Sequence, residues 1–212
     1  MLPSHSSLLL FLAGAIVLLV IPGPAVFYIV SRTVGQGRAA GLVSAAGIAV
    51  GTLFHVTAAA LGLSAVLVSS ARAFRVVQIL GALYLVFLGV RTLLRTEEAE
   101  AASYEGALSL RRIFGQGVVV NVLNPKTALF FLAFLPQFAD PARGSIAAQI
   151  LLLGTLFAVM GLCSDSAWAL VASQATAKLR TSLRWQRARK NISGGALIAL
   201  GLATAFSGSR TK

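Results

Sequence analysis

"LNPKTALFFLAFLPQF" (residues 123–138) places a proline and a lysine inside a stretch that is otherwise uncharged from Ile113 to Ala139. A stretch of this length can cross a bilayer as one helix. A proline costs about 3 kcal/mol in a helix interior, and a cation at the centre of a membrane helix costs about 2.5–3.5 kcal/mol on insertion scales. Both costs at one depth indicate a polar site inside a membrane protein. The alternative is a kink that serves only the packing of helices, without a binding site.

The whole chain has the composition of an integral membrane protein. It has 212 residues, of which 57% are hydrophobic and 11% are charged, and its mean hydropathy is +0.85. Soluble domains carry about 25% charged residues. Cys163 is the only cysteine and there are two histidines, which excludes an intramolecular disulfide and argues against a metal site. We therefore expect an all-α integral membrane protein without a metal.

The positions of the charges predict six transmembrane helices, over residues 7–30, 40–68, 74–94, 113–138, 145–177 and 191–209. They form a single membrane domain, 1–212, with two three-helix halves, 7–94 and 113–209. The connecting segment, 95–112, holds four of the six acidic residues and is predicted to be a solvated linker. Because three is odd, the second half enters the membrane from the opposite face, so a duplication would give inverted repeats.

The distribution of basic residues predicts the orientation. Cytoplasmic loops carry an excess of Lys and Arg, and the loops after spans one, three and five hold twelve of the 18. We therefore predict cytoplasmic odd-numbered loops, a cytoplasmic linker and both termini outside. The twelve residues are Arg32, Arg38, Arg91, Arg95, Arg111, Arg112, Lys178, Arg180, Arg184, Arg187, Arg189 and Lys190.

The net charge of +12 does not indicate a nucleic-acid partner, because no soluble module collects the basic residues. The run from Lys178 to Lys190 is interpreted as an anchor against anionic membrane lipid, with Trp185 at the interface.

Helix interruptions in corresponding places of two halves point to a transporter site. "IPGPAVFYIV" (21–30) interrupts span one and "LNPKTALFFL" (123–132) interrupts span four, and the two align with Pro24 beside Lys126. We therefore predict that helices one and four are broken. Backbone groups freed at that depth must line a buried or water-filled cavity, where a half-helix N-terminus favours an anion such as a carboxylate.

Lys126 needs a partner, and Asp165 is the only acidic residue in any other span. Our hypothesis is that both face one cavity in which substrate or protons compete for the pair. A static ion pair between spans four and five is the alternative. His55 follows Gly47 and Gly51, a spacing that lets another helix approach. It is either a hydrogen-bonded packing residue or a proton relay.

On these residues the chain resembles the LysE-type amino-acid exporter family, and most of all its homoserine/threonine exporter branch. The similarity rests on "PGPAVFYIVSRTVGQGRAAGL" (22–42), "LGALYLVFLGVRTL" (80–93) and above all "NPKTALFFLAFLPQF" (124–138). The resemblance implies export of an amino acid or close derivative across the bacterial inner membrane, driven by the proton gradient, without an organic cofactor. The signature positions that it carries over are Pro22, Gly23, Pro24, Asn124, Pro125, Lys126 and Asp165.

Two other classes of membrane protein compete with the exporter. A passive channel or ion permease of the same architecture remains the alternative, although a channel would not need the Lys126–Asp165 pair. A membrane enzyme is not expected, because the neighbours Cys163, Ser164 and Asp165 point in different directions on a helix. The sequence allows a monomer or a homodimer.

Overall fold

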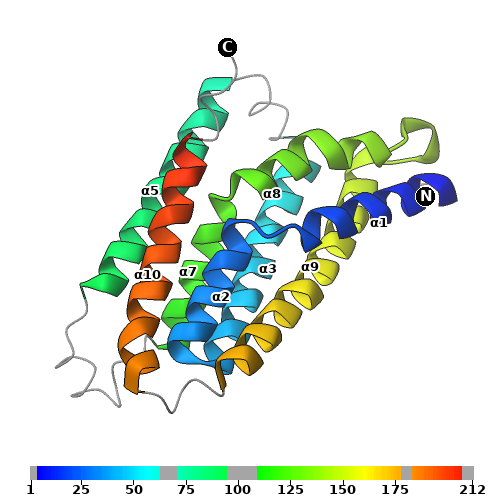
Figure 1. The fold of residues 1–212 in the computed structure, drawn as a ribbon. Coiled ribbons are helices and arrows are strands. Elements are labelled where there is room, and N and C mark those ends of the chain that lie inside the picture. Colours follow the sequence, from blue (N-terminus) through cyan, green and yellow to red (C-terminus); the bar gives the residue numbers. More distant parts are fainter. Residues whose placement is uncertain (1–3, 63–70, 95–108, 178–182, 207–212) are drawn as a thin grey trace.

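A computed structural model describes residues 4–62, 71–94, 109–177 and 183–206, and within them the chain forms only helices and turns (Figure 1). The α-helices are α1 (His5–Val20), α2 (Pro24–Gln36), α3 (Arg38–Ala60), α5 (Ala71–Leu93), α7 (Leu110–Val122), α8 (Pro125–Leu129), α9 (Ile146–Ala177) and α10 (Leu183–Phe206). Between α8 and α9 lie a π-helical segment, η1 (Phe130–Phe134), and two 3₁₀ segments, η2 (Leu135–Phe138) and η3 (Pro141–Arg143). The all-α expectation is confirmed.

Both predicted interruptions are confirmed as bends. The axes of α1 and α2 differ by 46°, and α7 and the segment Pro125–Phe138 differ by 48°. In each case a proline stands in the first turn of the new helix, Pro24 in α2 and Pro125 in α8. By helix start Pro24 corresponds to Pro125, one residue from the predicted alignment of Pro24 with Lys126. Proline suits this position because its missing N–H would have no helical partner there.

The number of spans is only partly settled. Within the described residues, α3 and α9 are each long and apolar enough to cross a membrane, and the two bent pairs bring the number to four if each pair is one span. In α5 the apolar segment is shorter, Ile79–Leu93. The six-span count and the inverted repeat stay predictions.

Three predicted boundaries were wrong. The second span was drawn to residue 68, but α3 ends at Ala60, where Gly62 has φ = 71° and closes the turn; residues 63–70 lie outside the described part. The linker was drawn to 112, but α7 starts at Leu110, capped by the Ser109 hydroxyl. The Lys178–Lys190 segment was treated as a loop, but α10 starts at Leu183. Residues 178–182 lie outside the described part, so lipid binding there stays a prediction.

The position of Arg32 also differs from the prediction. We assigned it to the first cytoplasmic loop, but it lies inside α2 with a buried side chain, because α2 continues to Gln36. The turn into α3 comes at Gly37, whose φ is 92°. A side chain at position 37 would be strained in that conformation.

The segment after α8 is irregular because of a second proline. The N–H of Leu135 bonds to the carbonyl of Phe130, five residues back, which makes η1 a π-helix. Pro136 follows and cannot donate to a carbonyl a turn earlier, so the helix first widens and then tightens into η2.

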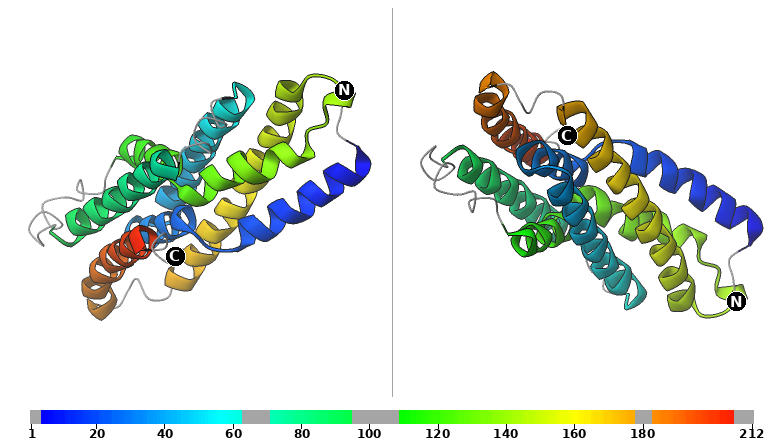
Figure 2. Two further views of the ribbon diagram at one scale, coloured as in Figure 1. Left: turned by 90° about the horizontal axis from the view of Figure 1, so that it is seen from above. Right: turned by 90° about the horizontal axis from the view of Figure 1, so that it is seen from below.

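The helices pack in pairs that join the two halves of the chain. α5 lies along α10, and α3 lies between α7 and α9 (Figures 1 and 2). The α3–α7 approach is close because Gly51 faces Asn121: a Cβ at position 51 would stand 2.8 Å from the Asn121 Cβ atom. A two-fold relation between halves would give pairs of this kind, since α5 and α10 are the third helices of their halves and α3 and α9 the second.

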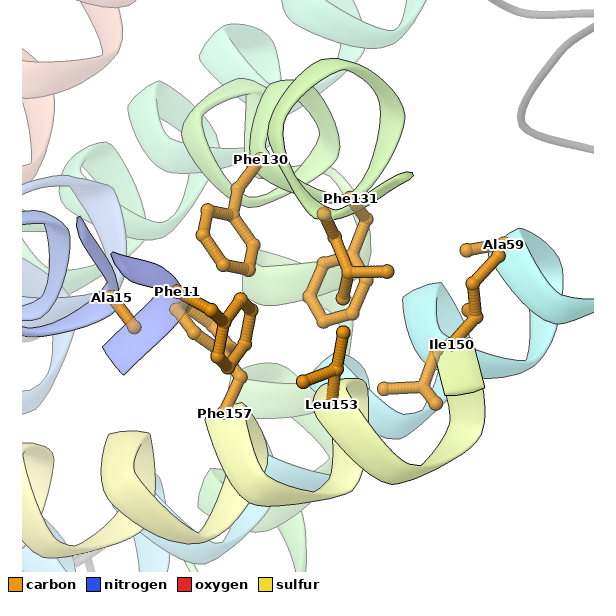
Figure 3. Close-up of a cluster of buried hydrophobic side chains, with 10 residues drawn as sticks. Phe11, Ala15, Ala59, Phe130, Phe131, Ile150, Leu153 and Phe157 are labelled. Carbon is orange, nitrogen blue, oxygen red and sulfur yellow. The ribbon is translucent and has the colours of Figure 1, made fainter. Parts of the chain in front are cut away.

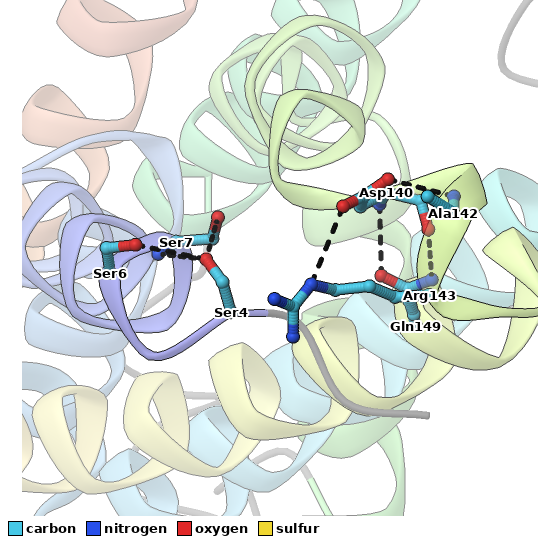
Figure 4. A network of polar contacts seen from close by, with 7 residues as sticks. All are labelled: Ser4, Ser6, Ser7, Asp140, Ala142, Arg143 and Gln149. Atoms are coloured by element: carbon cyan, nitrogen blue, oxygen red, sulfur yellow. Dashed lines mark hydrogen bonds and ion pairs between the residues drawn. The ribbon is translucent and has the colours of Figure 1, made fainter.

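An aromatic cluster holds α1 against the second half. Phe11 of α1 packs on Phe138. It also packs on Phe130, which stacks on Phe157 of α9 with ring centroids 4.1 Å apart (Figure 3). The turn that leads into α9 is held by Gln149, whose side-chain amide exchanges hydrogen bonds of 3.0 and 2.9 Å with the backbone of Asp140 (Figure 4). These contacts hold α1 and the η segments against the N-terminal half of α9.

Candidate functional site

The two breaks meet at one cavity. It encloses about 450 Å³ including its open mouth, and its walls come from the end of α1 and from α2, α3, α7, α8 and α9. The polar side chains that line it are Thr52, Asn121, Asn124, Lys126, Thr127 and Asp165. Apolar ones are Leu18, Leu19, Val26, Ile48 and Phe157. Sites for small molecules combine apolar walls with a few polar groups in this way.

The C-terminus of α1 ends at this cavity with carbonyls that lack helical partners. In an α-helix the carbonyl of residue 18 accepts from the N–H of residue 22, but residue 22 is a proline. Lys126 replaces the missing donor: its Nζ donates to the Leu18 carbonyl at 2.6 Å and also to the Ile21 carbonyl. The negative end of a helix dipole favours a cation there. Lys126, which belongs to the second break, therefore caps the first.

Gly23 makes this contact possible. A Cβ at position 23 would stand 3.0 Å from Cδ of Lys126, so a larger residue would displace the lysine stem. Gly23 is buried and is also the N-cap of α2, without a side chain of its own to satisfy the helix.

The N-terminus of α2 faces the cavity with free donors. Ala25 and Val26 line the cavity, and within the described residues their backbone N–H groups have no hydrogen-bond partner; the first bond of this turn is from Phe27 N to the Gly23 carbonyl. Lys126 and these two N–H groups thus present positive charge to the same space, as a carboxylate receptor requires.

Asn121 organises the wall opposite. Its side-chain amide donates to the Ile48 carbonyl and to the Thr52 hydroxyl, both at 2.8 Å, and its Oδ1 accepts from Thr127 at 3.0 Å. Pro125 cannot donate to the Asn121 carbonyl. Nε2 of His55 lies 3.0 Å from that oxygen and serves as its donor, together with the backbone N–H of Asn124.

Asp165 supplies the negative charge of the cavity. It lies in the middle of α9 and is 7% exposed. Within the described residues its carboxylate accepts no hydrogen bond and forms no ion pair within 4.0 Å, the one such ion pair there being Arg143–Asp140. Lys126 and Asp165 therefore share the cavity without touching, which does not match a static ion pair.

Comparison with known proteins identifies this arrangement. The model of the LysE type translocator family matches residues 16–208. The chain belongs to that family. It is therefore a multi-pass membrane translocator and not an enzyme.

Several bacterial relatives are similar over most of their length. An uncharacterized membrane protein of Bacillus subtilis, YrhP, is 29% identical over 95% of this chain and 99% of its own length. A leucine efflux protein of Salmonella typhimurium is 28% identical over 72% of this chain and 73% of its own. An uncharacterized membrane protein of Vibrio cholerae is 31% identical over 69% and 71%. No solved structure gives a significant match.

The predicted site residues of this LysE-family chain divide into two groups. Gly23, Asn124, Lys126 and Asp165 line the cavity. The three prolines, Pro22, Pro24 and Pro125, do not line it but create its open backbone groups. His55 does not line it either: it lies behind Asn121, stacked on Phe131 with ring centroids 5.9 Å apart.

Sequence reasoning missed Asn121, Thr52 and Thr127. The sequence does mark Asn121. It is a polar residue directly after the apolar run 118–120, and it stands one helical turn before Pro125. Thr52 stands one residue after Gly51, which marks the α3–α7 contact.

Proposed function

We propose that this LysE-family protein exports a neutral amino acid across the bacterial inner membrane, in exchange for protons. The observation that supports this most directly is the placement of Lys126, the N-terminus of α2 and Asp165 around one cavity. An amino acid is a zwitterion, and it needs an anion receptor and a cation receptor close together in a site of low dielectric constant.

In this proposal the substrate carboxylate binds Lys126 and the N–H groups of Ala25 and Val26. The substrate ammonium group binds Asp165, and the side chain lies against the apolar wall. Lys126 must then exchange the carbonyls of Leu18 and Ile21 for the carboxylate, which would release the C-terminus of α1. Proton transfer to Asp165 would weaken its hold on the ammonium group and couple export to the proton gradient.

The side chain of the substrate is the open choice. Leu18, Leu19 and Phe157 favour an aliphatic side chain, in keeping with the leucine efflux relatives. The resemblance to the homoserine/threonine branch favours a hydroxyl-bearing one, for which Thr52 and Thr127 are available partners. We propose the aliphatic side chain, because five apolar side chains, Leu18, Leu19, Val26, Ile48 and Phe157, line the cavity beside its charged groups.

Tracer efflux from preloaded cells tests both parts. Cells that overproduce the protein should export labelled leucine faster than cells with Asp165→Asn, and an uncoupler that collapses the proton gradient should abolish the difference. Efflux that continues unchanged with the uncoupler would support the passive channel instead. The same assay with labelled threonine and homoserine decides whether the substrate has an aliphatic or a hydroxyl-bearing side chain.

A charge exchange, Lys126→Asp with Asp165→Lys, tests the static pair. If the two charges only hold α8 and α9 together, the exchanged protein should transport. A folded exchanged protein without transport supports a binding role, since the α1 carbonyls would then face an acid.

The remaining topology is part of the same proposal. Both termini lie outside, the ends of α2, α5 and α9 face the cytoplasm, and the segment Lys178–Lys190 binds anionic lipid. A homodimer is compatible with it. In a protein without Cys163, cysteine labelling with a membrane-impermeant reagent before and after cell lysis tests the orientation at the exposed positions 39 and 142, which lie near opposite turns.

A further inference from the structure

The described part of the chain contains a second buried cation, away from the cavity. Arg32 of α2 is 6% exposed. It follows Val26, the last residue of α2 that lines the cavity, by six positions, which is about 9 Å along a helix. It therefore lies between the cavity and the end of the bundle that the charge distribution predicts to be cytoplasmic.

Arg32 has no anionic partner there. Its Nη2 donates to Oε1 of Gln116 in α7 at 2.8 Å, and its Cζ lies 5.2 Å from the centre of the Tyr28 ring. Its Nε is buried and has no hydrogen-bond partner among the described residues. Neither acidic residue of the described ranges, Asp140 or Asp165, forms an ion pair with it. A buried guanidinium that meets only neutral groups is costly.

The groups around Arg32 close the space between α2 and α7. The Tyr28 hydroxyl donates to the Ile113 carbonyl at 2.9 Å, and its distance of 3.4 Å to Gln116 Oε1 brings it into the same cluster. One turn further on, Oε1 of Gln36 is also buried and has no hydrogen-bond partner in the described part of the chain. These contacts lie beyond the residues that line the cavity, toward the end of α2 that is predicted to be cytoplasmic.

We propose that Arg32 is a second carboxylate-binding residue, which holds the amino acid on the cytoplasmic side before it reaches Lys126. The incoming carboxylate replaces Gln116 Oε1 on the guanidinium and also reaches the unpartnered Nε, since arginine binds carboxylates through two parallel N–H groups. The loss of the Arg32–Gln116 bond separates α2 from α7 and opens the way to the cavity. This inference rests on the proposed export of amino acids.

The test compares the two sides of the membrane in the full-length protein. The cytoplasmic KM for L-leucine comes from efflux out of preloaded cells, and the external KM comes from counterflow into vesicles. Arg32→Gln should raise the cytoplasmic KM by about ten- to hundredfold, the value of a hydrogen bond to a charged group, and leave the external KM unchanged. Arg32→Lys should raise it by a smaller factor. Arg38→Gln is the matched control, because Arg38 is exposed at the same end of the bundle and should change neither constant.

Four results would overturn the proposal. An unchanged cytoplasmic KM rejects it, and a rise on both sides indicates a purely structural role. The same defect after substitution of Glu97, Glu98, Glu100 and Glu105 by Gln would show that Arg32 serves a carboxylate of the chain itself. If Arg32→Gln does not accumulate, Arg32→Lys decides, and a wild-type KM rejects the proposal. Absence of leucine, threonine and homoserine export by the unaltered protein would instead reject the proposed function.

Discussion

Replacing Pro22 with alanine should make the protein less dependent on Lys126 for its stability. Pro22 leaves the carbonyl of Leu18 without its helical donor, and Lys126 Nζ takes that place at 2.6 Å. Alanine at position 22 restores an N–H that can reach the same oxygen. The cost of Lys126→Gln should therefore be smaller in the Pro22→Ala background than in the unaltered protein.

The magnitude follows from the two bonds that Lys126 makes. A hydrogen bond to a charged group contributes about 1.5–3 kcal/mol to stability. The bond to Leu18 is partly buried and should contribute in that range, whereas the bond to Ile21 is exposed and should add little. Interhelical hydrogen bonds in membranes average lower, about 0.6 kcal/mol, because the unfolded state also finds partners. We therefore expect a coupling free energy between Pro22 and Lys126 of about 1–2 kcal/mol.

The measurement is a double-mutant cycle on the free energy of unfolding in mixed micelles. Pro24→Ala provides the control in the same break, because Lys126 does not bond to the Val20 carbonyl that Pro24 leaves open. The cycle of Pro24 with Lys126 should be additive within about 0.5 kcal/mol. If the Pro22 cycle is equally additive, Lys126 does not cap α1 and the reasoning fails.

Two further predictions concern the contacts behind the cavity. Gly51→Ala should lower the free energy of unfolding by about 1–3 kcal/mol, because its Cβ would stand 2.8 Å from that of Asn121; Gly115→Ala, with nothing within 4 Å, should not lower it, and thermal unfolding in detergent compares the two. His55→Phe should keep proton-coupled efflux, since phenylalanine can stack on Phe131 in its place, and should cost only about 0.5–1.5 kcal/mol for the lost bond to Asn121. Loss of the response to an uncoupler in a folded His55→Phe protein would instead establish a proton relay.

Features that carry a local signal could be predicted from the sequence. Prolines inside apolar stretches marked both bends, and the spacing of Gly47, Gly51 and His55 marked the face of α3 that meets α7. Each of these signals works because a backbone constraint or a close approach leaves few residue choices at one position.

Features that depend on distant backbone groups could not be predicted. The partners of Lys126 are carbonyls of residues 18 and 21, and a carbonyl is the same whatever its side chain, so the sequence does not mark it. Arg32 was misplaced because we drew the spans between charges, which assumes that every charge faces water. Its buried guanidinium contacts the Tyr28 ring and Gln116, and neither residue marks itself in the sequence as a partner.

The crosswise capping of the two breaks has a consequence for biosynthesis. Lys126 of the second half completes α1, and His55 of the first half completes α7. A nascent chain that has emerged only as far as residue 94 would carry open carbonyls in the lipid until the ribosome has delivered residue 126. Such a chain should be degraded by membrane proteases unless the missing half is supplied as a separate polypeptide, and co-production of two fragments divided between residues 95 and 108 should rescue both.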